Sequence, residues 1–123
     1  MKNVNVQLKQ NSKMYSEYMN DIGGKDKAVL DSMLRHMQFN MNTITMNGDT
    51  LRNVISDTKL SVQQIRNAVS RLKKTSLIEA SGLLRAEYIV NPAFAFKGNE
   101  NMAWKAYTQM EEQRRARTIM DAL

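Results

Sequence analysis

The sequence predicts a mainly α-helical fold with one small β-hairpin, and three observations support this fold class. Apolar residues recur at helical spacing over residues 25–37 and 62–72, whereas residues 77–90 form short runs that suit strands. One proline and five glycines among 123 residues are too few for a disordered or fibrous chain. The hydrophobic content of 42% is enough for one small core, so we expect a single domain with appended terminal elements.

The first third of the chain is predicted to hold a short strand, two helices and a second strand. Alternating apolar residues indicate a strand at 3–9, and a shared apolar face indicates a helix at 14–22. Residues 25–37 form the next predicted helix, with its apolar stripe turned to the core. A β-branched run at 43–46 is too short for a helix and predicts a strand.

Cap and turn residues divide the middle of the chain. They precede a helix of about two turns at 51–55, and Ser61 is expected to cap the basic amphipathic helix that follows. Beyond this helix, residues 77–80 and 85–90 indicate the two strands of a hairpin, which Pro92 ends because proline cannot donate to a ladder.

The order helix, short strand, short helix, basic helix and hairpin is that of a winged helix-turn-helix. We expect the short strand to join the hairpin in a three-stranded sheet, and the two later helices to pack against the helix before them. The predicted parts are an N-terminal extension at 1–24, the winged helix-turn-helix domain at 25–98, and a C-terminal helix at 99–123.

The basic helix has one apolar stripe and an opposite polar side. The stripe consists of Val62, Ile65, Ala68, Val69 and Leu72. Side-chain amides can pair with adenine edges, Arg with guanine, and Lys or Ser with phosphate oxygens. We therefore expect the polar side to lie in the major groove of double-stranded DNA. The residues expected to contact DNA are Ser61, Gln63, Gln64, Arg66, Asn67, Ser70, Arg71, Lys74 and Arg85.

Positive charge is concentrated around this helix. Residues 59–85 hold six Lys and Arg and a single acid, Glu79, so they carry +5 of the chain's net charge of +6. An ordinary solvated helix face mixes acids with bases, although such a face remains the alternative interpretation of this helix taken alone. The charge favours a polyanionic partner, with nucleic acid preferred to an anionic membrane surface.

The C-terminal helix carries a face that the preceding elements do not need. This face consists of Ala103, Trp104, Ala106, Tyr107 and Met110. It either docks the tail onto the domain as a satellite core or forms the interface of a homodimer. A homodimer would place two basic helices on DNA half-sites about one helical turn apart.

Four runs of this sequence resemble the DNA-binding module of plasmid RepL-type replication proteins. They are Thr-Ile-Thr-Met at 43–46, Leu-Arg-Asn-Val-Ile-Ser at 51–56, the basic helix at 61–72 and Leu-Ile-Glu-Ala at 77–80. The more specific likeness is at 87–98, where a tyrosine, hydrophobic residues, Asn-Pro, aromatic residues and Lys-Gly follow one another as in that family.

The resemblance covers roughly residues 25–98 and has two departures. The family often has a glycine where this chain has Ser76, and an Arg-Gly pair where it has Arg85-Ala86. The resemblance implies plasmid replication or maintenance, through binding to origin repeats and recruitment of host replication proteins. Two other functions remain open, namely a plasmid or phage transcriptional regulator that uses the same helix, and a winged-helix adaptor that binds proteins.

The sequence offers no constellation typical of an enzyme, a metal site or a cofactor site. The one histidine, His36, cannot supply the histidine pair of a rolling-circle nickase and is expected to be a partly exposed helix residue. Gly23-Gly24-Lys25 lacks the glycine spacing and the Ser or Thr of a phosphate loop. Carboxylates such as Asp26 are expected on solvated helix faces. We therefore expect a non-enzymatic protein without a cofactor.

The sequence also allows a prediction of the compartment in which the protein is found. No apolar run approaches the length of a membrane span, residues 1–6 lack the apolar region of a secretory signal, and cysteine is absent. We expect a cytoplasmic protein without a membrane partner.

Overall fold

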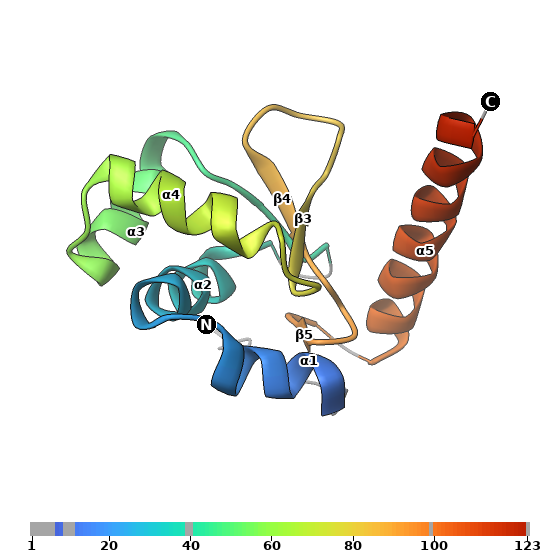
Figure 1. The fold of residues 1–123 in the computed structure, drawn as a ribbon, viewed down its shortest axis with the longest axis horizontal. Helices are drawn as coiled ribbons and strands as arrows, with labels where there is room; N and C mark the ends of the chain where they lie inside the picture. The colour runs from blue at the N-terminus through green and yellow to red at the C-terminus, as the bar shows by residue number, and fades with distance from the viewer. Residues whose placement is uncertain (1–6, 9–11, 39–40, 99, 123) are drawn as a thin grey trace.

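The computed structural model describes residues 7–8, 12–38, 41–98 and 100–122, and over these residues the fold is mainly helical with a small sheet, as predicted (Figure 1). In chain order the elements are β1 (Gln7–Leu8), α1 (Ser12–Ser16), the π-helical turn η1 (Glu17–Asp21), α2 (Gly24–His36), β2 (Thr43–Thr45), α3 (Gly48–Thr58), α4 (Val62–Leu72), β3 (Ile78–Ala80), β4 (Glu87–Val90), β5 (Ala95–Phe96) and α5 (Glu100–Ala122).

Strands β2, β4 and β3 form an antiparallel sheet in that order, which confirms the expected pairing of the short strand with the hairpin. Ile44 pairs with Tyr88, and Ile78 pairs with Val90. Because side chains alternate along a strand, these four residues face the core, whereas their neighbours face the other side of the sheet.

Helices α2, α3 and α4 lie on one side of the sheet (Figure 1), and α3 and α4 pack against α2, as predicted. Val29, Leu30 and Met33 of α2 are fully buried, and Ile65 and Leu72 of α4 lie against them in one apolar cluster. This packing leaves the opposite side of α4 in solvent.

Two of the boundaries that differ from the prediction have a clear cause in the backbone. The prediction of two turns for the third helix was wrong, because α3 begins at Gly48 and has 11 residues. The carbonyl of Asn47 accepts from Leu51 N at 3.2 Å, so the expected turn residues form the first helical turn. Strand β4 begins two residues later than predicted, because Ala86 has a left-handed backbone with φ +60° instead of an extended one.

The N-terminal part packs against residues near the end of the sheet. Of the strand predicted at 3–9, Gln7–Leu8 form β1, which pairs with β5, and the remaining residues lie outside the described ranges. The predicted helix at 14–22 begins earlier and continues as η1, where the buried ring of Tyr18 lies 5.1 Å from that of Phe94. Burial, together with a 2.6 Å hydrogen bond to Asp31, raises the pKa of Tyr18.

Asn42 is a buried amide that joins three segments. Its Nδ2 donates to the carbonyls of Val90 (3.0 Å) and Ala95 (2.6 Å), and its Oδ1 accepts from Lys97 N (3.0 Å). Its backbone φ is +54°, a left-handed conformation that asparagine tolerates better than most residues. Asn42 therefore fixes where the chain leaves β4 and enters β5.

The connector, which is the segment after β4 that contains Phe94, Phe96 and Lys97, is held by contacts from several sides. Phe94 and Phe96 are both buried. The Lys97 ammonium donates to the carbonyls of Arg35 (2.9 Å) and Met37 (3.1 Å) at the C-terminal end of α2. A cation at this end interacts favourably with the helix dipole. The connector is thereby docked onto α2.

Helix α5 lies on the side of the sheet opposite α2–α4 (Figure 1). Arg114 and Arg117 of α5 form ion pairs with Glu79 of β3 at 3.1 and 3.0 Å. Within the ranges that the structure describes, no helix is both long enough and apolar enough to cross a bilayer.

Replacing Asn42 with Ala should lower the free energy of unfolding by about 3 kcal/mol or more, because three buried backbone groups lose their partner. Urea denaturation measures this loss. The matched control is Asn53→Ala on the exposed side of α3, which should stay within about 0.5 kcal/mol of the parent. A loss at Asn42 as small as the control's would contradict the joining role of the amide.

Candidate nucleic-acid interface

Helix α4 begins with a capping box, which confirms the cap expected at Ser61. The Ser61 hydroxyl accepts from Gln64 N at 3.2 Å, and the Gln64 Oε1 accepts from Ser61 N at 2.9 Å. Each side chain thereby satisfies a backbone donor that the first helical turn leaves free. Both residues are exposed, and because their oxygens act as acceptors in the capping box, the Ser61 O–H and the Gln64 amide NH₂ keep their donor capacity.

The polar side of α4 is fully accessible. Gln63, Arg66, Asn67 and Ser70 are all exposed, and so is Lys74 just beyond the helix. Of the predicted apolar stripe on the other side, Ile65, Ala68, Val69 and Leu72 pack into the core, whereas Val62 is half-buried. The Gln63 Nε2 donates to the Asn67 Oδ1 at 2.9 Å, one helical turn away. The two amides therefore present one continuous set of donors and acceptors to solvent.

Arg71 differs from Arg66, the other cation of α4, because an acid of α2 binds it. Its guanidinium donates three hydrogen bonds of 2.8 to 3.0 Å to the two carboxylate oxygens of Asp26. The bonded carboxylate raises the pKa of Arg71. The expectation that Asp26 lies on a solvated face was wrong, because only 8% of the residue is exposed. Arg71 remains at the rim of the polar side but also links α4 to α2.

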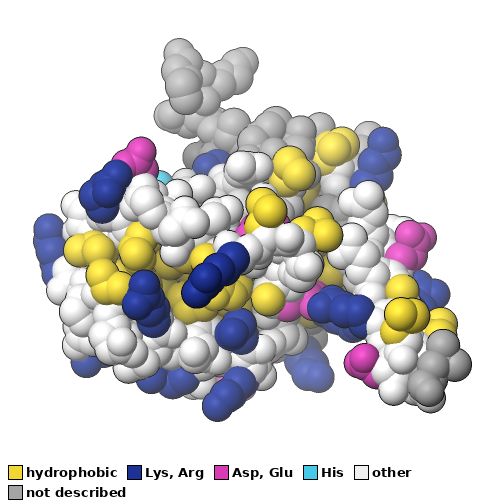
Figure 2. Space-filling model, turned by 90° about the horizontal axis from the view of Figure 1, so that it is seen from above, with side chains coloured by type: hydrophobic (Ala, Val, Ile, Leu, Met, Phe, Trp, Pro, Cys, Tyr) yellow, Lys and Arg dark blue, Asp and Glu magenta, His cyan; other side chains and the backbone are white. Residues whose placement is uncertain are grey.

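The lone acid of the basic segment points away from α4. Glu79 lies on the sheet face that α5 covers, where Arg114 and Arg117 bind its carboxylate. Figure 2 looks down on the side of the molecule that carries α4 and the hairpin tip, and Lys and Arg side chains clearly outnumber Asp and Glu there. The excess of positive charge therefore remains on the side of α4.

The hairpin loop at 81–86 projects on the same side of the molecule as α4 (Figure 1), and Arg85 in this loop is exposed. Ser81 organises the loop, because its hydroxyl accepts from the backbone N–H groups of Leu83 (3.1 Å) and Leu84 (3.4 Å). Next to this loop, on β4, the Tyr88 ring has its centre 6.0 Å from the Lys73 ammonium, just beyond the end of α4. The end of α4 and the hairpin are thereby in contact.

A second polar cluster ties α2 to α3. Asp57 accepts from Ser32 Oγ at 2.8 Å and lies 2.9 Å from His36 Nε2, and these two hydrogen bonds lower the pKa of Asp57. His36 is half-buried, which confirms the expected partly exposed position. Among the described residues there is no group of three or more His, Cys, Asp and Glu that could hold a metal ion.

The face predicted on the C-terminal helix is divided. Trp104 is 65% exposed, and its ring meets that of Tyr107 edge to face at 6.3 Å. Met110, in contrast, is 4% exposed because it packs against its own chain. The expectation that Met110 forms part of a dimer interface was therefore wrong. The side chains of Ala103 and Ala106 lie outside the described residues.

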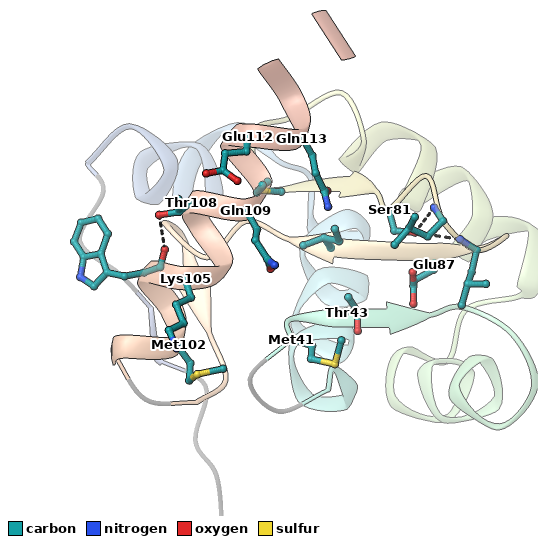
Figure 3. A pocket seen from close by; sticks show the side chains of 15 residues that line it. Met41, Thr43, Ser81, Glu87, Met102, Lys105, Thr108, Gln109, Glu112 and Gln113 are labelled. Atoms are coloured by element: carbon teal, nitrogen blue, oxygen red, sulfur yellow. Dashed lines mark hydrogen bonds between the residues drawn. The ribbon is translucent and has the colours of Figure 1, made fainter. Parts of the chain in front are cut away.

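A groove of about 990 Å³ separates α5 from the sheet and the hairpin loop. Thr43 and Glu87 project into it from the strands, and Lys105 and Gln109 project from α5 (Figure 3). Sequence reasoning missed this groove, because helical periodicity does not tell how far a terminal helix stands from the sheet.

Comparisons with protein-family models, with curated proteins and with solved structures find no match to this chain.

Replacing Arg71 with Ala should lower the temperature of thermal unfolding, because the buried carboxylate of Asp26 loses its partner. Arg66→Ala is the matched control, since Arg66 is exposed on the same helix. Calorimetry should find a clearly larger decrease for Arg71→Ala. In an Asp26→Ala background the Arg71 effect should mostly disappear, and an undiminished effect there would contradict the link.

Proposed function

We propose that this chain is a double-stranded DNA-binding protein with a winged helix-turn-helix arrangement. In this proposal α3 and α4 are the helix-turn-helix, α4 lies in the major groove, and the hairpin of β3 and β4 is the wing. Gln63 and Asn67 contact base edges, whereas Lys74 and Arg85 bind phosphates.

One observation carries this proposal. The exposed side of α4 holds amides, hydroxyls and cations without an acid, while its opposite side is anchored in the core. Within the described ranges, Arg66, Lys74 and Arg85 form no ion pair with this chain's own carboxylates. Their charges are therefore available to an external polyanion.

Within this proposal, the sequence resemblance to RepL-type proteins favours a role in plasmid replication or maintenance. The chain would bind origin repeats and recruit host replication proteins, without catalysing a reaction itself. A transcriptional regulator would use the same surface on an operator, so the genomic position of the bound sites separates the two roles. A protein-binding adaptor would show no salt-dependent affinity for DNA.

DNA binding should weaken steeply with salt. With about five to seven phosphate contacts, the slope of log K against log salt should lie near −4 to −6. Fluorescence anisotropy with a labelled duplex at several salt concentrations measures this slope. A slope near zero would contradict the proposal of DNA binding, and a protein-binding adaptor would then be the better interpretation.

Specificity and affinity should separate between two pairs of residues. Gln63→Ala or Asn67→Ala should cost roughly 1–3 kcal/mol on a site selected from random sequences and little on random DNA. Lys74→Ala or Arg85→Ala should weaken both complexes about equally, since phosphates carry no sequence. If both amide variants still prefer the selected site over random DNA as strongly as the parent chain does, α4 does not lie in the major groove.

We further propose a homodimer, because one helix reads few base pairs and the indole of Trp104 lies exposed on α5. Sedimentation at tens of micromolar should find a dimer for the full chain and a monomer for Trp104→Asp. Gln109→Asp, at an exposed polar position of the same helix, is the control and should stay dimeric. A monomeric parent chain would refute the dimer without affecting the DNA-binding proposal.

A further inference from the structure

We propose that the hairpin loop at 81–86 inserts Leu83 and Leu84 into the DNA minor groove as an apolar wedge that bends the duplex. This inference rests on the proposed DNA-binding function and assigns the wing a task beyond binding phosphate. It follows from the exposure of two adjacent leucines, the fixed backbone that presents them, and their place beside α4.

The two leucines are unusually exposed for their residue type. Leu83 is 78% exposed and Leu84 is 64% exposed, although leucine is among the residues most often buried. Within one loop, therefore, two neighbouring apolar side chains remain in water. A contact that covers both would release their hydration shells and favour the bound state.

The loop that carries them is ordered by its own hydrogen bonds. Besides accepting from both leucine N–H groups, Ser81 donates its own N–H to the Glu87 carbonyl at 2.9 Å, and Glu87 N returns a 3.4 Å bond to the Leu84 carbonyl. Gly82 has φ +77° and so supplies the left-handed backbone that this turn needs. A loop held in this way loses little conformational freedom when it binds.

The position of the loop favours DNA over protein as its partner. The loop projects on the side of the molecule that carries α4 (Figure 1), and Arg85 follows the leucines directly in the sequence. A loop beside a helix that occupies the major groove meets the phosphates and the minor groove next to it. Leucine is one of the residues that proteins insert between base steps there, kinking the duplex by roughly 20–90°.

The competing partner is a protein, because Leu83 and Leu84 also border the groove beneath α5. A protein-binding patch at this place would involve the other side of the groove as well. Met41, shortly before β2, also lines this groove and is 60% exposed. It therefore provides a matched control, as an exposed apolar residue of the same groove that is not on the hairpin tip.

Ring closure by DNA ligase tests the wedge with the full chain. The probe is a mixed-sequence duplex of about 150 base pairs, close to one persistence length, at low salt. The parent chain should accelerate closure at least about tenfold. The double variant Leu83→Ser, Leu84→Ser should lose most of this acceleration, while its affinity should change less than about tenfold because the unstacking cost disappears with the apolar contact.

Two further variants test whether another apolar tip is sufficient and whether an apolar residue away from the tip contributes. Leu83→Met, Leu84→Met keeps an apolar wedge and should retain the acceleration, and so should Met41→Ser. A second readout is a duplex with 2-aminopurine at a flexible TA step, whose fluorescence should rise in the saturated parent complex as the bases unstack.

The outcomes distinguish this inference from the proposed function. If the parent chain binds the duplex without accelerating closure or raising the fluorescence, the wedge is wrong and DNA binding stands. Equal acceleration by the double serine variant, or an equal loss with Met41→Ser, also overturns the wedge. A parent chain that does not bind the duplex overturns the proposed function, and the wedge falls with it.

Discussion

The carboxylate of Asp26 is nearly buried at the start of α2, and the position of α4 depends on the partner that this buried charge requires. Arg71 supplies that partner with three hydrogen bonds, in a geometry that only a guanidinium offers. Packing of apolar side chains alone would hold α4 against α2 but would leave some freedom to slide or rotate. The ion pair fixes the rotation, and with it the direction in which Gln63 and Asn67 point.

A second constraint acts where the chain leaves the sheet. Asn42 and Lys97 dock the connector, so the Asn-Pro to Lys-Gly stretch, on which the sequence-based expectation of a RepL-type protein rests, has a structural task here. Asn91 adds to it, because its side chain donates to the Ser76 carbonyl at 3.2 Å and accepts from Ala93 N at 2.9 Å. The side-chain hydrogen bonds described for these residues are all with backbone groups of the chain itself, so they stabilise the domain. The likeness in that stretch is thus explained by the fold as readily as by a function.

Local pattern was sufficient to predict most of the elements and the polar side of α4, but not strand β5 or the length of α3. The stripe from Ile65 to Leu72, the cap at Ser61 and the sheet order follow from spacing along the chain, and the structure confirms them. What could not be predicted depends on contacts between distant residues. Arg71 meets Asp26 across 45 positions, and β1 pairs with β5 near the other end of the chain. Burial of Met110 likewise depends on where α5 lies, and periodicity within one helix does not contain that information.

Glu79 connects the two surfaces to which we assign tasks. Its carboxylate is held by Arg114 and Arg117 of α5, and its backbone belongs to the strand that leads directly into the hairpin loop. The C-terminal helix is therefore anchored at the base of the proposed wing. A partner that docks on α5 would act on the strand that supports Leu83, Leu84 and Arg85. These ion pairs also keep Glu79, the single acid of residues 59–85, away from α4. In a homodimer built through α5, the same ion pairs would therefore set the distance between the two wings.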